Sequence, residues 1–250
     1  MILLLDIGNS NVKWAVLDNG QLGSSTAASH RGQTIAKVLS QTGSTLTRPD
    51  EVWLANVAGN DADQVVIDWV AEHWSCPLHI ATPQTQACAV TNGYCQPSQL
   101  GVDRWLGLIA CYAAEKKAAC VVSCGTAITA DVIDADGKHL GGFILPGLNM
   151  AQDALNAGTH DIKTHNSLQS VSSLDLATDT GTAISHGAMY AAAAFIDKLC
   201  ADMEQTLSIT IELIITGGDA ELVLPLITRR AKHQPQLVMQ GLVRLRAECQ

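Results

Sequence analysis

Apolar runs alternate with polar turns and amphipathic stretches along the first half of the chain, a rhythm typical of an α/β protein. The apolar runs predict strands at residues 2–7, 12–17, 52–57 and 78–81. Helical spacing of apolar residues predicts helices at 34–40, 62–74 and 104–115. The pair Asn19-Gly20 predicts a two-residue hairpin turn after the second strand. The stretch 83–100, rich in Gln, Thr, Pro and Gly, breaks the rhythm and predicts a loop.

The pattern of the N-terminus starts again at residue 119. ACVVSCGTAITADVIDADGKHLGG is once more a strand, a glycine followed by a small hydroxylated residue, a strand, and a turn that contains glycine. Gly8 and Gly20 are 12 residues apart, and so are Gly125 and Gly137. A repeat of this length is the size of a domain, so we expect two similar halves.

We expect these halves to be residues 1–117 and 118–250. The second half continues with a strand-like segment in GGFILPG, a polar loop at 158–180, a long Ala-rich helix at 183–203 and a strand at 211–215. TGGDA follows, with a further helix, and a final strand is predicted at 236–239.

Small polar residues interrupt the first hairpin. Asp, Asn and Gly are poor strand formers, so the cluster DIGNSN has a purpose other than filling a core. Glycine at a bend lets backbone N–H groups approach an anion such as a phosphate. A carboxylate beside phosphates normally acts through Mg²⁺, often with water between, which is the role expected for Asp6. The alternative is that the bends at DIGNSN and SCGT and the glycine turn at TGGDA are three unrelated tight turns.

The known phosphate-binding motifs GxxxxGK[ST] and GxGxxG after a strand are missing, so P-loop and Rossmann folds are unsupported. We therefore expect the duplicated ribonuclease-H-like fold of actin, hexokinase and the Hsp70 ATPase, with a nucleotide cleft between the two halves.

Composition narrows the class of partner. The 250 residues are 47% hydrophobic, enough for a substantial core, and carry a formal net charge of -9. An acidic chain without a basic stripe argues against nucleic-acid binding. Neither a transmembrane span nor a signal peptide is predicted. Eight cysteines lie scattered, which favours reduced thiols in the cytoplasm, and His160 and His165 give a weak metal signal.

Four motifs in order resemble type III pantothenate kinase over essentially the whole chain. DIGNSN at 6–11 and SCGTAITAD at 123–131 resemble the family's two phosphate motifs. NGYCQPSQLGVDRW at 92–105 resembles its pantothenate segment, and TGGDA at 216–220 its adenosine motif. The resemblance implies phosphorylation of pantothenate by ATP, a first step of coenzyme A synthesis, with a divalent cation such as Mg²⁺, in a homodimer whose active site lies at the interface.

The resemblance also implies roles for single residues. Those assigned to ATP are Asp6, Ile7, Gly8, Asn9, Ser10, Asn11, Val12, Lys13 and Thr126, with Gly217 and Gly218 on the adenosine side. Those assigned to pantothenate are Tyr94, Gly101, Val102, Asp103, Arg104 and, from the neighbouring subunit, Thr180.

Asp103 is the expected catalytic base, because a carboxylate can accept the proton of an alcohol that attacks the γ-phosphoryl group. Arg104 beside it can neutralise a carboxylate or the transferring group. Taken alone, the pair also fits a helix N-terminus, with Asp103 as a cap and Arg104 in solvent. Asp131 can orient a metal-bound water or cap a turn.

Ser123 departs from the family pattern. Many members carry an aspartate there that binds a monovalent cation, K⁺ or NH₄⁺, and serine lacks that charge. We therefore expect weak or no dependence on such a cation. Two alternatives to pantothenate phosphorylation stay open: a kinase of the same fold for another small hydroxylated acceptor, and a nucleotide-binding regulator without enzymatic activity.

Overall fold

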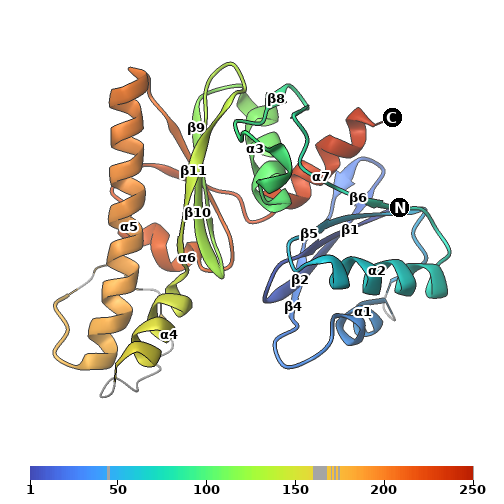
Figure 1. Cartoon of the computed structure of the whole chain (residues 1–250), viewed down its shortest axis with the longest axis horizontal. Coiled ribbons are helices and arrows are strands. Elements are labelled where there is room, and N and C mark those ends of the chain that lie inside the picture. Colours follow the sequence, from blue (N-terminus) through green and yellow to red (C-terminus); the bar gives the residue numbers. More distant parts are fainter. Residues whose placement is uncertain (44–45, 160–167, 170, 172, 174, 250) are drawn as a thin grey trace. The chain divides into compact units, whose positions relative to one another are not determined.

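The computed structural model describes residues 1–43, 46–159, 168–169, 171, 173 and 175–249. The chain forms two compact units, one of residues 1–114 with 236–250 and one of residues 115–235. Each unit contains its own sheet and helices (Figure 1). His160 and His165, the weak metal candidates, lie outside the described residues.

The main sheet of unit 1 follows the order β3-β2-β1-β5-β6, with β4 paired to β2. Strand β1 is antiparallel to β2 and parallel to β5, as the sequence pattern predicts. The strands of this unit are β1 (Ile2–Ile7), β2 (Asn11–Asp18), β3 (Gln21–Leu22), β4 (Thr26–Ser29), β5 (Glu51–Asn56), β6 (Leu78–Ile80), β7 (Gln86–Ala87) and β8 (Val90–Thr91). Its helices are α1 (Ile35–Gly43), α2 (Asn60–His73), the short 3₁₀ turn η1 (Pro97–Gln99), α3 (Val102–Glu115) and α7 (Leu237–Glu248).

The sheet of unit 2 follows the order β11-β10-β9-β12-β13. Its strands are β9 (Ala119–Cys124), β10 (Ala127–Ile133), β11 (His139–Pro146), β12 (Glu212–Thr216) and β13 (Ala231–His233). Its helices are α4 (Leu148–Gly158), α5 (Thr180–Leu207), α6 (Ala220–Val223) and the 3₁₀ turn η2 (Leu224–Leu226). Strand β9 is antiparallel to β10 and parallel to β12, which reproduces the arrangement around β1. The repeat predicted from the glycine spacing is therefore a repeat of sheet topology.

The turns that the glycines predicted are also matched. Asn19 and Gly20 have positive φ angles of 49° and 78°, as a two-residue hairpin turn of this twist requires. Gly137, at the corresponding turn of unit 2, has φ 83°. Both hairpins therefore depend on residues that tolerate the left-handed region.

Helices cover one face of each sheet with apolar side chains. In unit 1, α1 and α2 bury Val38, Val66 and Trp69 against the strands. In unit 2, the long helix α5 buries Met189 and Ile196 over β9 and β10 (Figure 1). None of the described helices combines the length and the apolar character that crossing a bilayer requires.

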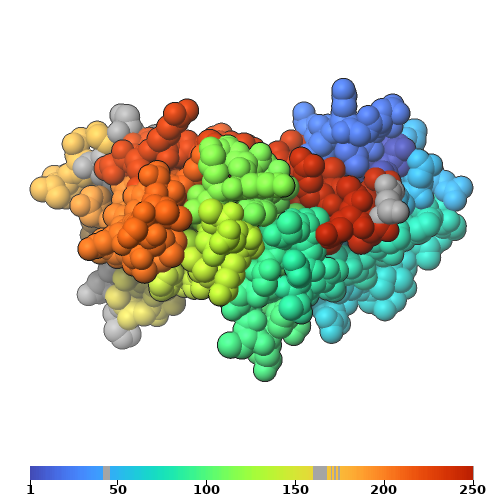
Figure 2. Space-filling model, turned by 90° about the horizontal axis from the view of Figure 1, so that it is seen from above, coloured from blue at the N-terminus to red at the C-terminus, as the bar shows by residue number. Residues whose placement is uncertain are grey.

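The end of the chain differs from the expectation. The predicted strand at 236–239 is wrong: the residues begin helix α7, and the last strand is β13. Leu237, Leu242 and Leu245 are buried along one side of that helix, at helical rather than strand spacing. The helix packs against β1, β2 and β5, so residues 236–250 group with unit 1 and not with the second half (Figure 2).

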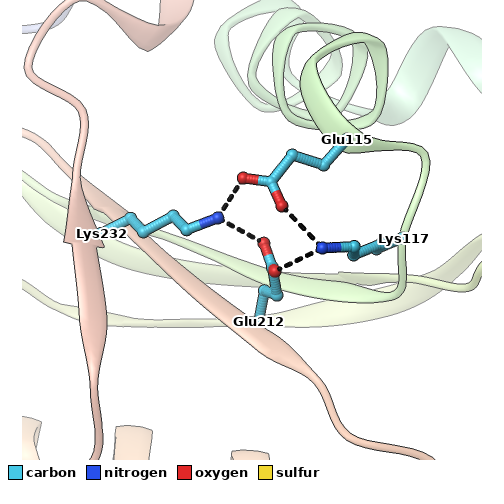
Figure 3. Close-up of polar contacts among 4 residues, drawn as sticks. All are labelled: Glu115, Lys117, Glu212 and Lys232. Carbon is cyan, nitrogen blue, oxygen red and sulfur yellow. Dashed lines mark hydrogen bonds and ion pairs between the residues drawn. The ribbon is translucent and has the colours of Figure 1, made fainter.

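Four charged side chains form a closed ion-pair network in unit 2 (Figure 3). Lys117 lies 3.1 Å from Glu115 and 3.3 Å from Glu212, while Lys232 pairs with the same two carboxylates. The hydrogen bond from Lys232 is the main cause that lowers the pKa of Glu115 to about 2. The network joins the first residues of unit 2 to β12 and β13, and its exposure to solvent keeps its contribution to stability small.

Candidate active site

The first polar site lies in unit 1, where β1 turns into β2. The Gly8 amide donates to the carbonyl of Asn11 at 3.0 Å and closes the turn. Asp6 stands near the end of β1, directly opposite Lys13 in the strand register. A carboxylate, an ammonium group and a glycine-containing bend therefore meet within a few residues.

The carboxyl of Asp6 is almost removed from water, with 9% of the residue exposed. Burial raises its pKa from 3.8 to about 6, since a carboxylate loses hydration in the interior. The ammonium group of Lys13 acts in the opposite direction, and the negative charge of Asp103 raises the pKa further. Asp103 is thus close enough to interact electrostatically with Asp6.

The segment GVDR forms the start of helix α3. Gly101 has a local reason: a Cβ there would lie 2.6 Å from Oδ1 of Asp103, so glycine keeps space for this carboxylate. The same Oδ1 accepts the backbone N–H of Arg104 at 2.8 Å. Arg104 is only 8% exposed, so the interpretation that places its side chain in solvent is wrong. Its Nη1 donates to the hydroxyl of Tyr94 at 2.9 Å.

A buried asparagine at the start of the motif at 92–105, to which no role was assigned from sequence, organises the loop before α3. Asn92 donates from its side chain to the carbonyls of Gln84 and Pro97 at 3.2 and 3.3 Å. Its side-chain oxygen accepts the amide of Tyr94 at 3.0 Å. Asn92 therefore fixes the backbone at Tyr94, whose hydroxyl in turn holds Arg104.

Other predicted residues of the first turn divide by exposure. Ile7 and Val12 are fully buried, so they can offer a ligand only backbone atoms. Asn9 and Asn11 are exposed, while Ser10 is buried. The segment at the end of β4 was not among the predicted site residues. Ser29, His30 and Arg31 all form hydrogen bonds with Gly8 or Ser10 of the turn. The polar run SHR was the signal in the sequence that could have indicated it.

The corresponding bend of unit 2 lies between β9 and β10. Gly125 donates to the carbonyl of Ala127 at 3.1 Å, as Gly8 does in the first bend, and Thr126 follows it. A Cβ at Gly8 or Gly125 would find only ordinary contacts, at 3.7 and 3.8 Å. Neither glycine has a positive φ angle, so the protein itself does not require glycine at these two bends. Space for an approaching ligand remains as the reason.

Glycines elsewhere in unit 2 serve packing instead. A Cβ at Gly217 would lie 2.1 Å from the carbonyl oxygen of Cys124, and its φ angle is 98°. A Cβ at Gly147 would lie 2.2 Å from the carbonyl oxygen of Gly125. Gly218 has open space around the Cβ position, so of the two glycines in TGGDA it is the one available to a ligand.

Hydroxyl groups surround the expected cation position. Ser123 is in register with Thr129 on β10 and with Thr216 on β12. Within the described residues no group of three or more His, Cys, Asp or Glu is arranged to hold a metal ion. Asp131 lies within β10, not at a turn, and Oδ1 of its carboxyl is 2.9 Å from His139 Nε2 in a fully buried pair. Thr180 is exposed at the first position of α5.

Comparison with known proteins decides the family. The model of the type III pantothenate kinase family matches residues 2–202. The chain belongs to this family. A type III pantothenate kinase from Nitrosococcus oceani is 41% identical over 98% of this chain and 93% of its own length. Another, from Alcanivorax borkumensis, is 32% identical over the full length of both chains.

Solved structures agree on the fold. A Campylobacter jejuni protein provisionally described as a Baf family transcriptional activator matches 99% of this chain and 98% of its own, with a TM-score of 0.61 and 21% identity. A Sinorhizobium meliloti protein provisionally described as a 2-dehydro-3-deoxygalactonokinase matches 97% and 94%, with a TM-score of 0.56 and 11% identity. The kinase family and these neighbours confirm the duplicated ribonuclease-H-like fold class that the two hairpins predicted.

Alanine substitutions distinguish ligand glycines from packing glycines. Gly8→Ala and Gly125→Ala are expected to fold with an unfolding free energy within about 1 kcal/mol of the wild type, because the added methyl group fits. Both are expected to lose ATP affinity by at least about tenfold, because that methyl occupies the approach to the backbone. Gly217→Ala is expected to lose more than about 2 kcal/mol of stability. Urea unfolding and ATP titration test this; unchanged ATP binding by Gly8→Ala would contradict it.

Asp6 makes stability depend on pH in a defined direction. The pKa of Asp6 is higher in the folded state than the ordinary 3.8. The free energy of unfolding is therefore highest, as far as Asp6 contributes, below pH 4, and it falls as the pH rises toward 6. Asp6→Asn lacks this loss and is expected to be more stable than the wild type at pH 7.5, by up to about 3 kcal/mol. Urea unfolding between pH 4 and 8, without nucleotide or divalent ions, measures the difference. A gap that did not grow with pH would show that Asp6 is not the cause.

Proposed function

We infer that this chain transfers the γ-phosphoryl group of ATP to pantothenate, giving 4′-phosphopantothenate in the first step of coenzyme A synthesis. Membership of the family supports the reaction. The observation that carries the proposed mechanism is the arrangement at the start of α3, where Oδ1 of Asp103 accepts the amide of Arg104 and the buried guanidinium of Arg104 donates to Tyr94. Phosphoryl transfer is mainly positioning and charge stabilisation, and this arrangement supplies both.

Asp103 is proposed as the catalytic base. Its carboxylate is fixed at the start of α3 by the amide of Arg104, and it can take the proton of the attacking primary alcohol. Asp6, at the end of β1, interacts electrostatically with Asp103.

Arg104 is proposed to bind the carboxylate of pantothenate. The guanidinium is a planar fork of N–H donors that suits a carboxylate, and the hydroxyl of Tyr94 accepts one of its hydrogen bonds and fixes its orientation. Tyr94, Gly101 and Val102 complete the proposed substrate residues of this unit, and Gly101 and Val102 act by placing Asp103.

The turn from Gly8 through Asn11, with Lys13, is proposed to bind the phosphates of ATP. Thr126 is proposed as a phosphate contact in unit 2, and Gly218 as a contact on the adenosine side, with Gly217 holding its backbone. The carboxylate of Asp6 fits a divalent cation such as Mg²⁺, because it is a hard oxygen ligand whose charge lacks hydration. Such an ion would neutralise charge on the phosphates. Because the reaction uses ATP and the cysteines are expected to be reduced thiols, we propose that it takes place in the cytoplasm.

Replacement of the base separates substrate from mechanism. Wild-type protein with Mg-ATP is expected to release ADP only when pantothenate is present. Asp103→Asn is expected to lower kcat by about 10²- to 10⁴-fold while ATP binding persists, because general-base catalysis has this size. Tyr112→Phe on the same helix serves as a control outside the proposed site. Full activity in Asp103→Asn would refute the base, and no turnover with pantothenate would favour another hydroxylated acceptor or a regulatory protein.

Monovalent cations are proposed to have little effect. Ser123 lies among hydroxyl groups, which supply no negative charge to hold K⁺ or NH₄⁺ firmly. Turnover is expected to change less than about twofold when sodium is replaced by potassium. Ser123→Asp is expected to create a dependence on potassium. A large activation of the wild type by potassium would overturn this proposal.

A homodimer is proposed as the active form, with Thr180 reaching the substrate of the neighbouring subunit. Strand β11 is the edge of its sheet and exposes apolar side chains, with Phe143 54% and Ile144 63% exposed. Tyr190 on α5 is 67% exposed. An uncovered apolar edge strand is suited to pairing with a second copy.

Mixing two inactive variants tests the shared site. Asp103→Asn and Thr180→Ala are each expected to be strongly impaired. A mixed dimer of the two would contain one intact site, so a refolded equimolar mixture is expected to regain about a quarter of wild-type turnover. Light scattering establishes the dimer. No recovery in a mixture shown to contain mixed dimers would place both residues in one subunit or remove Thr180 from the site.

A further inference from the structure

The phosphate turn of unit 1 is held by a segment that follows β4. The amide of His30 donates to the carbonyl of Ser10 at 3.0 Å, and the hydroxyl of Ser29 donates to the same carbonyl at 3.2 Å. His30 Nε2 lies 2.8 Å from the carbonyl oxygen of Gly8, and therefore carries the proton. Arg31 donates from Nε and Nη2 to the hydroxyl oxygen of Ser10, at 3.1 and 3.0 Å. Backbone and side chains together fix this guanidinium at the turn.

Two features set Arg31 apart from its neighbours. Ser29 and His30 bind backbone carbonyls and so stabilise the shape of the turn, whereas Arg31 binds a side-chain hydroxyl and brings a positive charge. A guanidinium has five N–H donors, and the two that contact Ser10 occupy one edge of its fork. Arg31 is exposed, so the rest of the group borders solvent.

A bound nucleotide changes the charge balance at the turn. Asp6 and Asp103 bring two negative charges, and Lys13 opposite Asp6 and Arg104 next to Asp103 bring two positive ones. A nucleotide triphosphate adds several more negative charges, and the chain as a whole is acidic at -9. The guanidinium of Arg31 would add an attractive positive charge for phosphates where the other charged side chains already balance.

We propose that Arg31 is an ATP-binding residue, whose guanidinium binds the β- and γ-phosphates at the turn that contains Ser10. This inference rests on one part of the proposed function, the binding of ATP phosphates at this turn, and does not depend on pantothenate as the acceptor. The contact to Ser10 holds the fork in advance, so little side-chain entropy is lost when phosphate binds. Bidentate contacts of guanidinium with phosphate are among the strongest hydrogen bonds in proteins.

Nucleotides of different phosphate length test the contact. ATP, ADP and AMP are titrated by calorimetry against wild type, Arg31→Gln and Arg31→Lys, without pantothenate. Arg31→Gln is expected to lose at least about tenfold in ATP affinity and less in ADP affinity, with AMP unchanged. Arg31→Lys is expected to lie between, because it keeps the charge and loses the fork. Arg48→Gln, which removes an exposed arginine bonded to the carbonyl of Ser75, is the matched control and is expected to bind all three like wild type.

A purely structural role predicts a different result. If Arg31 only held the turn, Arg31→Gln would lower the melting temperature of the nucleotide-free protein, and Arg31→Lys would lose as much ATP affinity as Arg31→Gln. Either that pattern or unchanged ATP affinity in Arg31→Gln overturns the proposal. Wild-type protein that binds ATP but does not phosphorylate pantothenate would defeat the proposed acceptor and leave this test intact. Wild-type protein that binds no ATP would overturn both.

Discussion

A carboxyl group held away from water at the end of β1 is the constraint on which the first unit depends. Asp6 sits in a strand that is buried on both sides, between β2 and β5, and its pKa of about 6 measures the free-energy cost of ionising it there. A core residue chosen for stability alone would be apolar. The negative charge of Asp6 is partly compensated by Lys13 on the opposite strand. A phosphate-bound cation, if held there, would compensate it further. Stability is given up where the chemistry needs charge.

The two units use the same topology for different chemistry. Both place a glycine bend after the first strand, which the glycine amide closes: Gly8 donates to the carbonyl of Asn11, three residues on, and Gly125 to that of Ala127, two residues on. The bend of unit 1 is surrounded by charges, including Asp6, Lys13 and Arg31. The bend of unit 2 is surrounded by hydroxyls, including Thr126 and, on the adjoining strands, Ser123 and Thr216. The same glycine bend therefore occurs twice, once surrounded by charged side chains and once by hydroxyl groups.

Local sequence signals predicted the features that depend on local physics. The strand-bend-strand pattern predicted the hairpin of β1 and β2, Asn19-Gly20 predicted the turn from β2 to β3, and apolar spacing predicted α3 from residue 104, two residues after its start at Val102. The start of α5 at Thr180 was placed a few residues late, although Asp179 caps it by accepting the amide of Thr182 at 2.9 Å. Caps of this kind were readable in the sequence.

Features that depend on tertiary contact were not readable. The run LVMQGLVRLRAE carries β-branched residues and a glycine, which weaken the helix signal, and only packing against unit 1 shows that it is helix α7. Strand β4 is exposed and short, so its sequence TAAS gives little strand signal, and with it the role of Arg31 was missed. The contact between Arg31 and Ser10 spans 21 residues, beyond any local pattern.

The C-terminal helix α7 contributes to the placement of the segment that carries the proposed base. The family model ends at residue 202, yet Gly241 of α7 approaches α3 so closely that a Cβ would lie 2.2 Å from the carbonyl oxygen of Leu106. Helix α3 begins with the proposed base, so its placement is set partly by α7. The same helix ends at Glu248, whose carboxylate accepts the amide of Cys88 at 2.7 Å.

That last contact supports a turn with two strained residues. Cys88 and Ala89 have φ angles of 51° and 61°, a region that costs a residue with a side chain about 1–2 kcal/mol. The turn joins β7 to β8, directly before Asn92, which fixes the backbone at Tyr94. Strain persists only where surrounding structure holds it, and here the carboxylate of Glu248 is the holding group. The end of the chain therefore positions both the helix of Asp103 and the loop that carries Tyr94 to Arg104.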